Sequence, residues 1–257
     1  MASSHTTMDD TLQPSKPLAV PQSTRVHFNR NFITQAVCEL RFPTLFELEE
    51  EKPPIKLAHA LRKEFPTHSR LKNLKLNDEK LTQTSAHSFR SRKDRWIFNL
   101  RTSAITLETS HYDSFEDFKT RLSFVLNASL ETIDSDFFTR VGLRYINGIP
   151  CTKNEVGEWI NPDIVAPLSA GIYGEPVEFS QRVYGNTDIG GKFLFQHGLG
   201  EAKHGSFQYI LDYDFSIDDV LANQVIDTVQ QLHDAQHNMF RWSLGKKALE
   251  YLERKSG

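Results

Sequence analysis

Alternating apolar and polar residues predict most of the strands in this chain. Between Arg95 and Arg101 a tryptophan, a phenylalanine and a leucine occupy every second position, and a period of two is typical of a strand with one buried face. Pro43 ends the first such run, because proline has no N–H to donate to a strand ladder. Strands are predicted for residues 32–42, 81–89, 95–101, 104–112, 137–149, 177–184, 192–197 and 206–215.

Apolar residues at helical spacing predict the helices. The clearest stripe follows Ser114, and Asp117 lies three positions later, as in a capping box. Pro53-Pro54 opens a shorter helix that we expect to end near Phe65, since proline is tolerated in a first turn. Further helices are predicted from Asn161-Pro162 to about Ala170, from Ser216 with Asp219 as its cap, and from about Met239 to Leu252.

Three short strings recur in the same order at nearly one spacing. Cys38–Phe42 resembles Val141–Tyr145 about 103 residues later, Trp96–Phe98 resembles Phe193–Phe195 at about 97, and Tyr112-Asp113 resembles Tyr213-Asp214 at about 101. Each half therefore reads as a strand, a helix, three strands and a helix. A domain-sized period indicates two similar half-domains.

The predicted fold is α+β, with two such halves joined into a curved antiparallel sheet covered by helices on one face. The element order resembles that of saddle-like sheets and helix-grip proteins. The expected boundaries are residues 31–134 for the first half and 135–257 for the second, in one compact unit. Residues 1–30 are rich in Ser, Thr, Pro and Gln, and we expect them to form a disordered tail.

Composition adds a few limits. The chain has 257 residues, 39% hydrophobic residues and a formal net charge of −3, which is the profile of a globular protein and not of a dedicated nucleic-acid binder. Its two cysteines cannot form a disulfide framework or a four-cysteine zinc site, and Cys38 lies in an apolar run that suggests a core position. No stretch has the roughly 20 apolar residues of a membrane span. We expect a cytoplasmic protein with no membrane association.

The run from Arg140 to Asn147 is the most distinctive string. On a strand, Arg140, Gly142 and Arg144 share one face, and Tyr145 lies on the other. Two guanidinium groups beside a glycine would leave room for a carboxylate, a phosphate or a partner backbone. In the alternative interpretation, both arginines pair with acids of neighbouring elements. The candidate binding residues are Arg41, Arg140, Arg144, Tyr145 and Asn147.

Gly142–Asn147, Glu39–Phe42 upstream and Leu211–Asp214 downstream together resemble a sporadically distributed, highly divergent family of uncharacterised bacterial proteins. The resemblance extends from about residue 30 to the C-terminus. It implies a bacterial origin, and no catalytic residues come with it. Sporadic distribution is common among defence and toxin–antitoxin genes, so the resemblance favours a binding or immunity role.

Two other groups suggest alternative chemistry. Residues 62–101 are locally basic, and a basic hairpin beside Trp96 would suit a phosphate backbone; the candidate nucleic-acid contacts are Lys72, Lys75, Arg90, Arg92, Lys93 and Arg95. His233 and His237 lie four apart on one helix face, as in zinc sites, but the sequence offers no convincing third ligand, and surface histidines explain the spacing as well.

The acids Asp212, Asp214, Asp218 and Asp219 gather at a predicted strand-to-helix junction, where acids favour a helix start. The chain has no phosphate-binding loop, dinucleotide fingerprint or nucleophile elbow. We therefore expect no catalytic residues, metal or cofactor. The predicted function is a non-enzymatic binding protein with a protein partner, as in a bacterial defence or toxin–antitoxin-like system. The alternatives are a nucleic-acid-binding saddle and a small-ligand or enzyme pocket between sheet and helices.

Overall fold

The computed structural model describes residues 16–24, 28–77, 80–201 and 207–253. Within these residues the strands are β1 (Ile33–Arg41), β2 (Thr67–Asn77), β3 (Lys80–Arg90), β4 (Trp96–Arg101), β5 (Ala104–Thr109), β6 (Phe137–Pro150), β7 (Phe179–Asn186), β8 (Lys192–Glu201) and β9 (Phe207–Leu221). The α-helices are α1 (Ile55–Leu61), α2 (Phe115–Ile133), α3 (Val156–Trp159), α4 (Pro162–Ser169), α5 (Val225–Ser243) and α6 (Lys246–Glu253).

All nine strands belong to one antiparallel sheet, in the order β2-β3-β4-β5-β1-β6-β9-β8-β7. The central pair joins β1 to β6, with Cys38 opposite Leu143 and Arg41 opposite Arg140. Counting outward from this pair, one half continues β5, β4, β3, β2 and the other β9, β8, β7. The chain is therefore an α+β protein whose two segments meet at their first strands.

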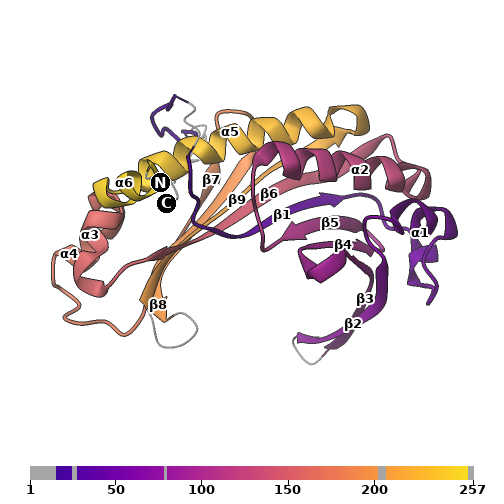
Figure 1. Cartoon of the computed structure of the whole chain (residues 1–257), viewed down its shortest axis with the longest axis horizontal. Helices are drawn as coiled ribbons and strands as arrows, with labels where there is room; N and C mark the ends of the chain where they lie inside the picture. Colours follow the sequence, from indigo (N-terminus) through magenta and orange to yellow (C-terminus); the bar gives the residue numbers. More distant parts are fainter. Residues whose placement is uncertain (1–15, 25–27, 78–79, 202–206, 254–257) are drawn as a thin grey trace, which may run out of the picture.

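The two long helices, α2 and α5, lie side by side along one face of the sheet (Figure 1). Their apolar stripes explain this placement, because Phe118, Leu122 and Val229 are all buried. The sheet ends bend away from these helices, so the opposite face lies on the inside of the curve (Figure 1). One continuous hydrophobic cluster, with members from Phe32 to Leu252, fills the layer between sheet and helices.

Two helix starts predicted from the sequence are present in the structure. Ser114 Oγ accepts a hydrogen bond from the Asp117 backbone N–H at the start of α2. Pro162 opens α4 after Asn161, whose side chain accepts from the Asp163 backbone N–H. Both caps satisfy backbone donors that the first helical turn leaves without intrahelical partners.

The predicted helix start at Ser216 and Asp219 is wrong. Residues 216–221 extend β9, pairing with β6 from Gly142 opposite Ser216 to Phe137 opposite Leu221. The ladder therefore overrides the local capping signal, and α5 begins only at Val225. The predicted break before Met239 is also misplaced: α5 continues to Ser243, and the chain turns at Gly245, where an added Cβ would lie 2.4 Å from the Glu158 carbonyl oxygen.

β2 was not predicted. Its apolar residues do not alternate cleanly, since Thr67–Arg70 contains no aliphatic side chain, and the strand is defined by its pairing with β3. The first segment thus has four strands after its first helix, where three were expected.

Part of the predicted N-terminal tail lies against the folded chain. The Leu18 backbone N–H donates to the Asn186 carbonyl, and the Ser23 backbone N–H donates to Asn238 Oδ1. Phe28 packs against the core. These contacts differ from the expectation of a disordered tail, and residues 1–15 and 25–27 lie outside the described residues.

Candidate functional site

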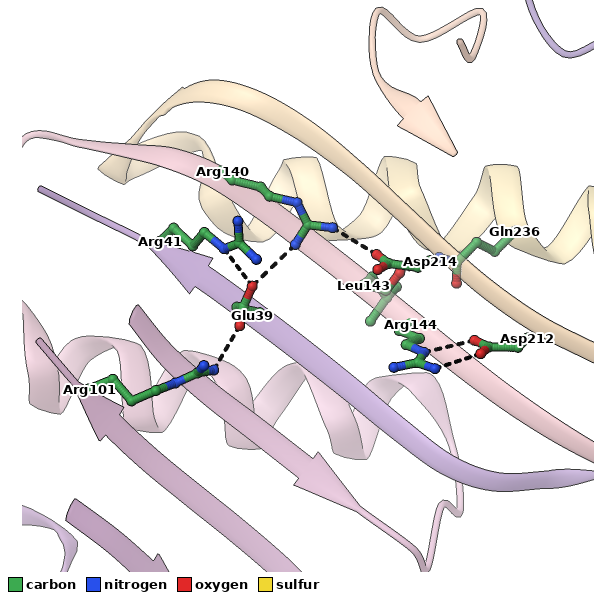
Figure 2. A network of polar contacts seen from close by, with 9 residues as sticks. All are labelled: Glu39, Arg41, Arg101, Arg140, Leu143, Arg144, Asp212, Asp214 and Gln236. Atoms are coloured by element: carbon green, nitrogen blue, oxygen red, sulfur yellow. Dashed lines mark hydrogen bonds and ion pairs between the residues drawn. The ribbon is translucent and has the colours of Figure 1, made fainter. Parts of the chain in front are cut away.

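The sheet face opposite the long helices carries a cluster of charged side chains (Figure 2). These residues alternate along their strands with buried ones such as Leu40, Leu143 and Tyr213, so they point away from the helices. We call this group the open-face cluster, and it consists of Glu39, Arg41, Arg101, Arg140, Arg144, Asp212 and Asp214.

Glu39 is the centre of the open-face cluster. Arg41 Nε donates to one carboxylate oxygen and Arg101 Nη2 to the other, each at 2.7 Å. Arg140 Nη1 lies 3.4 Å from the same oxygen that Arg41 binds. The Glu39 side chain is 18% exposed, so three guanidinium groups surround a carboxylate largely removed from water.

The pKa of Glu39 shows which effect dominates there. Burial would raise it, because a carboxylate loses hydration in the protein. The hydrogen bond from Arg41 and the charges of Arg101, Arg41 and Arg140 outweigh burial, and the pKa is lowered from its ordinary value. Glu39 is therefore an anion at neutral pH that holds three arginines together.

Arg140 connects Glu39 to Asp214. Its Nη2 donates to Asp214 Oδ1 at 2.8 Å while its Nη1 faces Glu39. The side chain reaches both by lying across Gly142, where an added Cβ would be 2.3 Å from Arg140 Nη1. The expected open space over Gly142 is therefore filled by Arg140 itself, because a long side chain without a competing neighbour can fold over the glycine.

Arg144 makes the second ion pair on β6. Its Nε and Nη2 donate to the two oxygens of Asp212 at 2.8 and 2.6 Å, a bidentate arrangement. Both arginines of β6 thus pair with acids of the adjacent strand β9, as in the alternative interpretation of the sequence. Arg144 remains 42% exposed and Arg41 54% exposed, so both still present guanidinium surface to solvent.

The other two predicted binding residues lie on the opposite side of the sheet. Tyr145 and Asn147 are buried beneath the helices and line a cavity there. Asn147 donates to the Leu211 carbonyl. The predicted set is therefore divided by the sheet: Arg41, Arg140 and Arg144 are together on the open face, and Tyr145 and Asn147 are not with them.

Two of the predicted nucleic-acid residues form ion pairs with nearby acids. Lys72 pairs with Glu51 at 3.3 Å, and Arg90 lies 3.8 Å from Asp94. Arg92 and Lys93 belong to the β3–β4 turn, where Lys93 has a φ of +62°, and Arg95 follows it. Lys75 lies on β2, and its side chain is outside the described part of the structure.

The pair His233 and His237 gives no support to a metal centre. His233 stacks on Phe115 with ring centroids 3.8 Å apart, and its Nδ1 lies 3.1 Å from Tyr145 Oη. Among the described residues, no group of three or more His, Cys, Asp or Glu side chains could hold a metal ion. Cys38 is fully buried, which raises its thiol pKa, and it is a core residue as predicted.

The sequence analysis did not identify Glu39 as the central residue or Arg101 as its partner. The available signal was the alternation of side chains along a strand: Glu39 and Arg41 are two residues apart on one strand, as are Asp212 and Asp214. Alternation predicts which residues share a face of the sheet, but it does not predict which strands are neighbours. Gln236, whose Nε2 donates to the Leu143 carbonyl of β6, gave no signal beyond its place on a helix.

Comparison of the chain with protein-family models, curated proteins and solved structures found no match. No helix within the described residues is both long and apolar enough to cross a bilayer. Function therefore has to be inferred from the geometry of this chain.

Proposed function

We propose that this chain is a non-enzymatic binding protein that recognises a protein partner through the open face of its sheet. The observation that carries the proposal is the open-face cluster, which presents partly exposed arginines that carboxylates hold in fixed positions. Arg41 and Arg144 are the proposed anchors, since both combine exposure with a carboxylate contact. Arginine is enriched among residues that dominate protein interfaces.

The charge pattern favours a protein over a polyanion. This face carries four arginines and three carboxylates, so the acids offset most of the positive charge that would attract a phosphate backbone. A protein surface with both signs of charge can match such a pattern, and complementary charges give specificity and fast association. Among the basic residues of 62–101, Lys72 and Arg90 contact nearby acids, and Arg92 and Lys93 lie in the β3–β4 turn.

The positions of the arginines also reduce the cost of binding. Arg144 is held by two hydrogen bonds and Arg41 by one, so each loses less side-chain freedom when a partner binds. Glu39 and Asp212 have side chains only 18% and 11% exposed. They act as supports under the arginines, and the partner meets the guanidinium groups first.

We also propose that the sheet arose by internal duplication and acts as a saddle. The matched strand order on either side of β1 and β6 supports this, as does the recurrence of Trp96–Phe98 on β4 and Phe193–Phe195 on β8, each third from the centre line. The resemblance noted from the sequence adds a bacterial defence or toxin–antitoxin-like system as the proposed setting.

The test is capture of partners with matched variants. Tagged wild-type protein and an Arg41→Ala, Arg144→Ala double variant are incubated with nuclease-treated extract of the native cell at low and high salt, and bound proteins are identified by mass spectrometry. Arg62→Ala is the control, because Arg62 is an exposed arginine just after α1, outside the sheet. Circular dichroism verifies that all three proteins are folded.

We expect a stoichiometric protein that binds wild type and the control alike. Its purified form should bind the double variant at least about tenfold more weakly, as for the loss of one or more interface anchors. Equal binding to the double variant would contradict the proposal. Recovery of nucleic acid without nuclease, lost at high salt, would move the function to the basic segment.

A further inference from the structure

β7 is the last strand at one end of the sheet, and only one of its two edges is paired. It pairs along its whole length with β8, from Phe179 opposite Leu199 to Asn186 opposite Lys192. No other strand of the described residues lies against it. A strand in this position presents a row of backbone N–H and C=O groups to which another strand can bind.

The N-terminal segment shows which residues of β7 direct their backbone groups to the free edge. The Leu18 N–H donates to the Asn186 carbonyl, so this carbonyl points away from β8. Backbone groups of successive residues in a strand point in opposite directions. Ser180, Arg182 and Tyr184 are an even number of positions from Asn186, so their N–H and C=O groups also face the free edge.

The free edge of β7 lacks the features with which proteins usually prevent pairing with another chain. Such edges are commonly protected by lysines, prolines or bulges. β7 contains neither lysine nor proline, and its register with β8 is unbroken. Val183 is 47% exposed and Tyr184 is 66% exposed. The strand at the other end of the sheet, β2, carries Arg70, Lys72 and Lys75. β7 is therefore the edge suited to addition of a strand.

Two exposed residues of opposite charge lie on either side of Ser180. Glu178 directly precedes β7, and Arg182 belongs to it. Neither side chain forms an ion pair with a described residue. They are four positions apart, which is about 13 Å along an extended chain, so they cannot pair with each other. Both are two positions from Ser180, so in an extended chain they share one face.

A second copy of β7 has the charges that would pair with these two. If two copies run antiparallel about a two-fold axis at Ser180, Glu178 of each copy lies opposite Arg182 of the other. On the other face, Val177 of each copy lies opposite Val183 of the other, and both valines are exposed. Opposite charges and apolar pairs directly across two antiparallel strands both stabilise a sheet.

Three other registers fit less well. An axis at Arg182 places two guanidinium groups opposite each other, and like charges in that position are destabilising. An axis at Val183 needs the Asn186 carbonyl, which already accepts from the Leu18 N–H. An axis at Gln181 leaves each of the two charges without an opposite charge across from it. The register centred on residue 180 avoids all three problems.

We propose that this chain forms a homodimer in which β7 adds antiparallel to β7 of a second copy, with the two-fold axis at Ser180. The interface is isologous, so Glu178 and Arg182 form two equivalent ion pairs. The two sheets of nine strands become one continuous sheet. This association goes beyond the proposed partner binding, because β7 is three strands away from β6, which carries Arg144.

The test is sedimentation velocity of the full chain at concentrations from about 1 to about 300 µM, a range that suits the weak association expected for one pair of strands. Wild type is compared with Arg182→Glu, Glu178→Arg and the control Arg62→Glu. Arg62 is exposed, lies just after α1, and its replacement changes the net charge as Arg182→Glu does. We expect wild type and the control to dimerise alike, and each edge variant at least about tenfold more weakly.

A mixture of the two edge variants tests the register. Arg182→Glu has an acid on both sides of Ser180, and Glu178→Arg has a base on both sides. An equimolar mixture should therefore dimerise, although neither variant does so well alone. The double variant Glu178→Arg, Arg182→Glu should dimerise as wild type does, because exchange of the charges restores both ion pairs. Damage to the fold of β7 would not be repaired in either experiment.

Ser180→Pro tests the backbone pairing itself. Proline removes an N–H that faces the free edge and leaves in place the N–H groups that face β8. We expect this variant to remain folded by circular dichroism and to lose the dimer. The matched control, Ser180→Ala, should retain both the fold and the dimer.

Three results would overturn the proposal. One is a wild-type protein that stays monomeric at about 300 µM. Another is association that the edge variants leave unchanged, which would place the interface elsewhere. The third is failure of both the mixture and the double variant to regain association. The Arg41→Ala, Arg144→Ala variant should dimerise as wild type does, so its loss of a partner alone would concern only the proposed function.

Discussion

Replacement of Glu39 by glutamine should destabilise the protein through the open-face cluster. Glutamine keeps the size of the side chain and removes the charge that holds three guanidinium groups together. Arg41 and Arg101 are 54% and 42% exposed, and each contact with Glu39 should be worth only about 0.5 kcal/mol. Arg140 is 20% exposed, and leaving it without this carboxylate should cost more, though it retains Asp214.

Together these losses predict a decrease of about 2 kcal/mol in the free energy of unfolding at pH 7. Urea denaturation, analysed by linear extrapolation, measures it. The matched control is Glu131→Gln, which removes the carboxylate of an exposed ion pair between Lys56 and Glu131. The Lys56 and Glu131 side chains are 78% and 67% exposed, so we expect the free energy of unfolding to change by less than about 0.5 kcal/mol.

The pH dependence gives a sharper test. The pKa of Glu39 is lower in the folded protein than the value of about 4.3 for an unperturbed glutamate. Its contribution is therefore complete above pH 4.3 and is lost as pH falls through the folded-state pKa. The difference between wild type and Glu39→Gln should shrink below about pH 4. A difference no larger than that of the control, or one that persists at low pH, would refute the reasoning.

Two further predictions concern the second half of the sheet. Gly198→Ala should lower the free energy of unfolding, measured by urea titration, by at least about 1 kcal/mol, because the new Cβ would lie 2.1 Å from the Phe179 carbonyl oxygen. Gly200→Ala is the control and should be nearly neutral, because its Cβ would meet no atom within 4 Å. Burial lowers the pKa of His197 to about 4, so stability should fall by about 2 kcal/mol between pH 7 and 5 as the unfolded chain takes up a proton. His197→Gln should flatten this part of the pH profile, and His59→Gln, at an exposed position, should leave it unchanged.

Local signals in the sequence predicted secondary structure correctly where no pairing with a distant strand overrides them. The Ser114 cap is an example: its acceptor and the Asp117 N–H are three residues apart, and no strand pairs with this segment. Ser216 and Asp219 have the same spacing, yet they belong to β9. Thirteen residues of β6 are paired opposite that strand, and this ladder decides the conformation. The sequence could not show that β6 and β9 are neighbours.

The candidate site was predictable to the same extent. Alternation placed Arg140 and Arg144 on one strand face and Tyr145 on the other, as the structure has them. The identity of their acids depends on strand order, and the open space expected over Gly142 depends on the rotamer of Arg140. Gln236 is identifiable only once α5 is seen to cross β6, since its contact with Leu143 spans 93 residues.

The pairing of β1 with β6 has a consequence for synthesis of the protein. As the chain leaves the ribosome, β5 can cover one edge of β1, but the other edge must wait for β6, whose Arg140 lies opposite Arg41. Until then an apolar strand with unpaired backbone groups is open to other nascent chains. We therefore expect folding to be completed late and to be slow for a chain of this length. We also expect overproduction to favour aggregation when translation is faster than the pairing of β1 with β6.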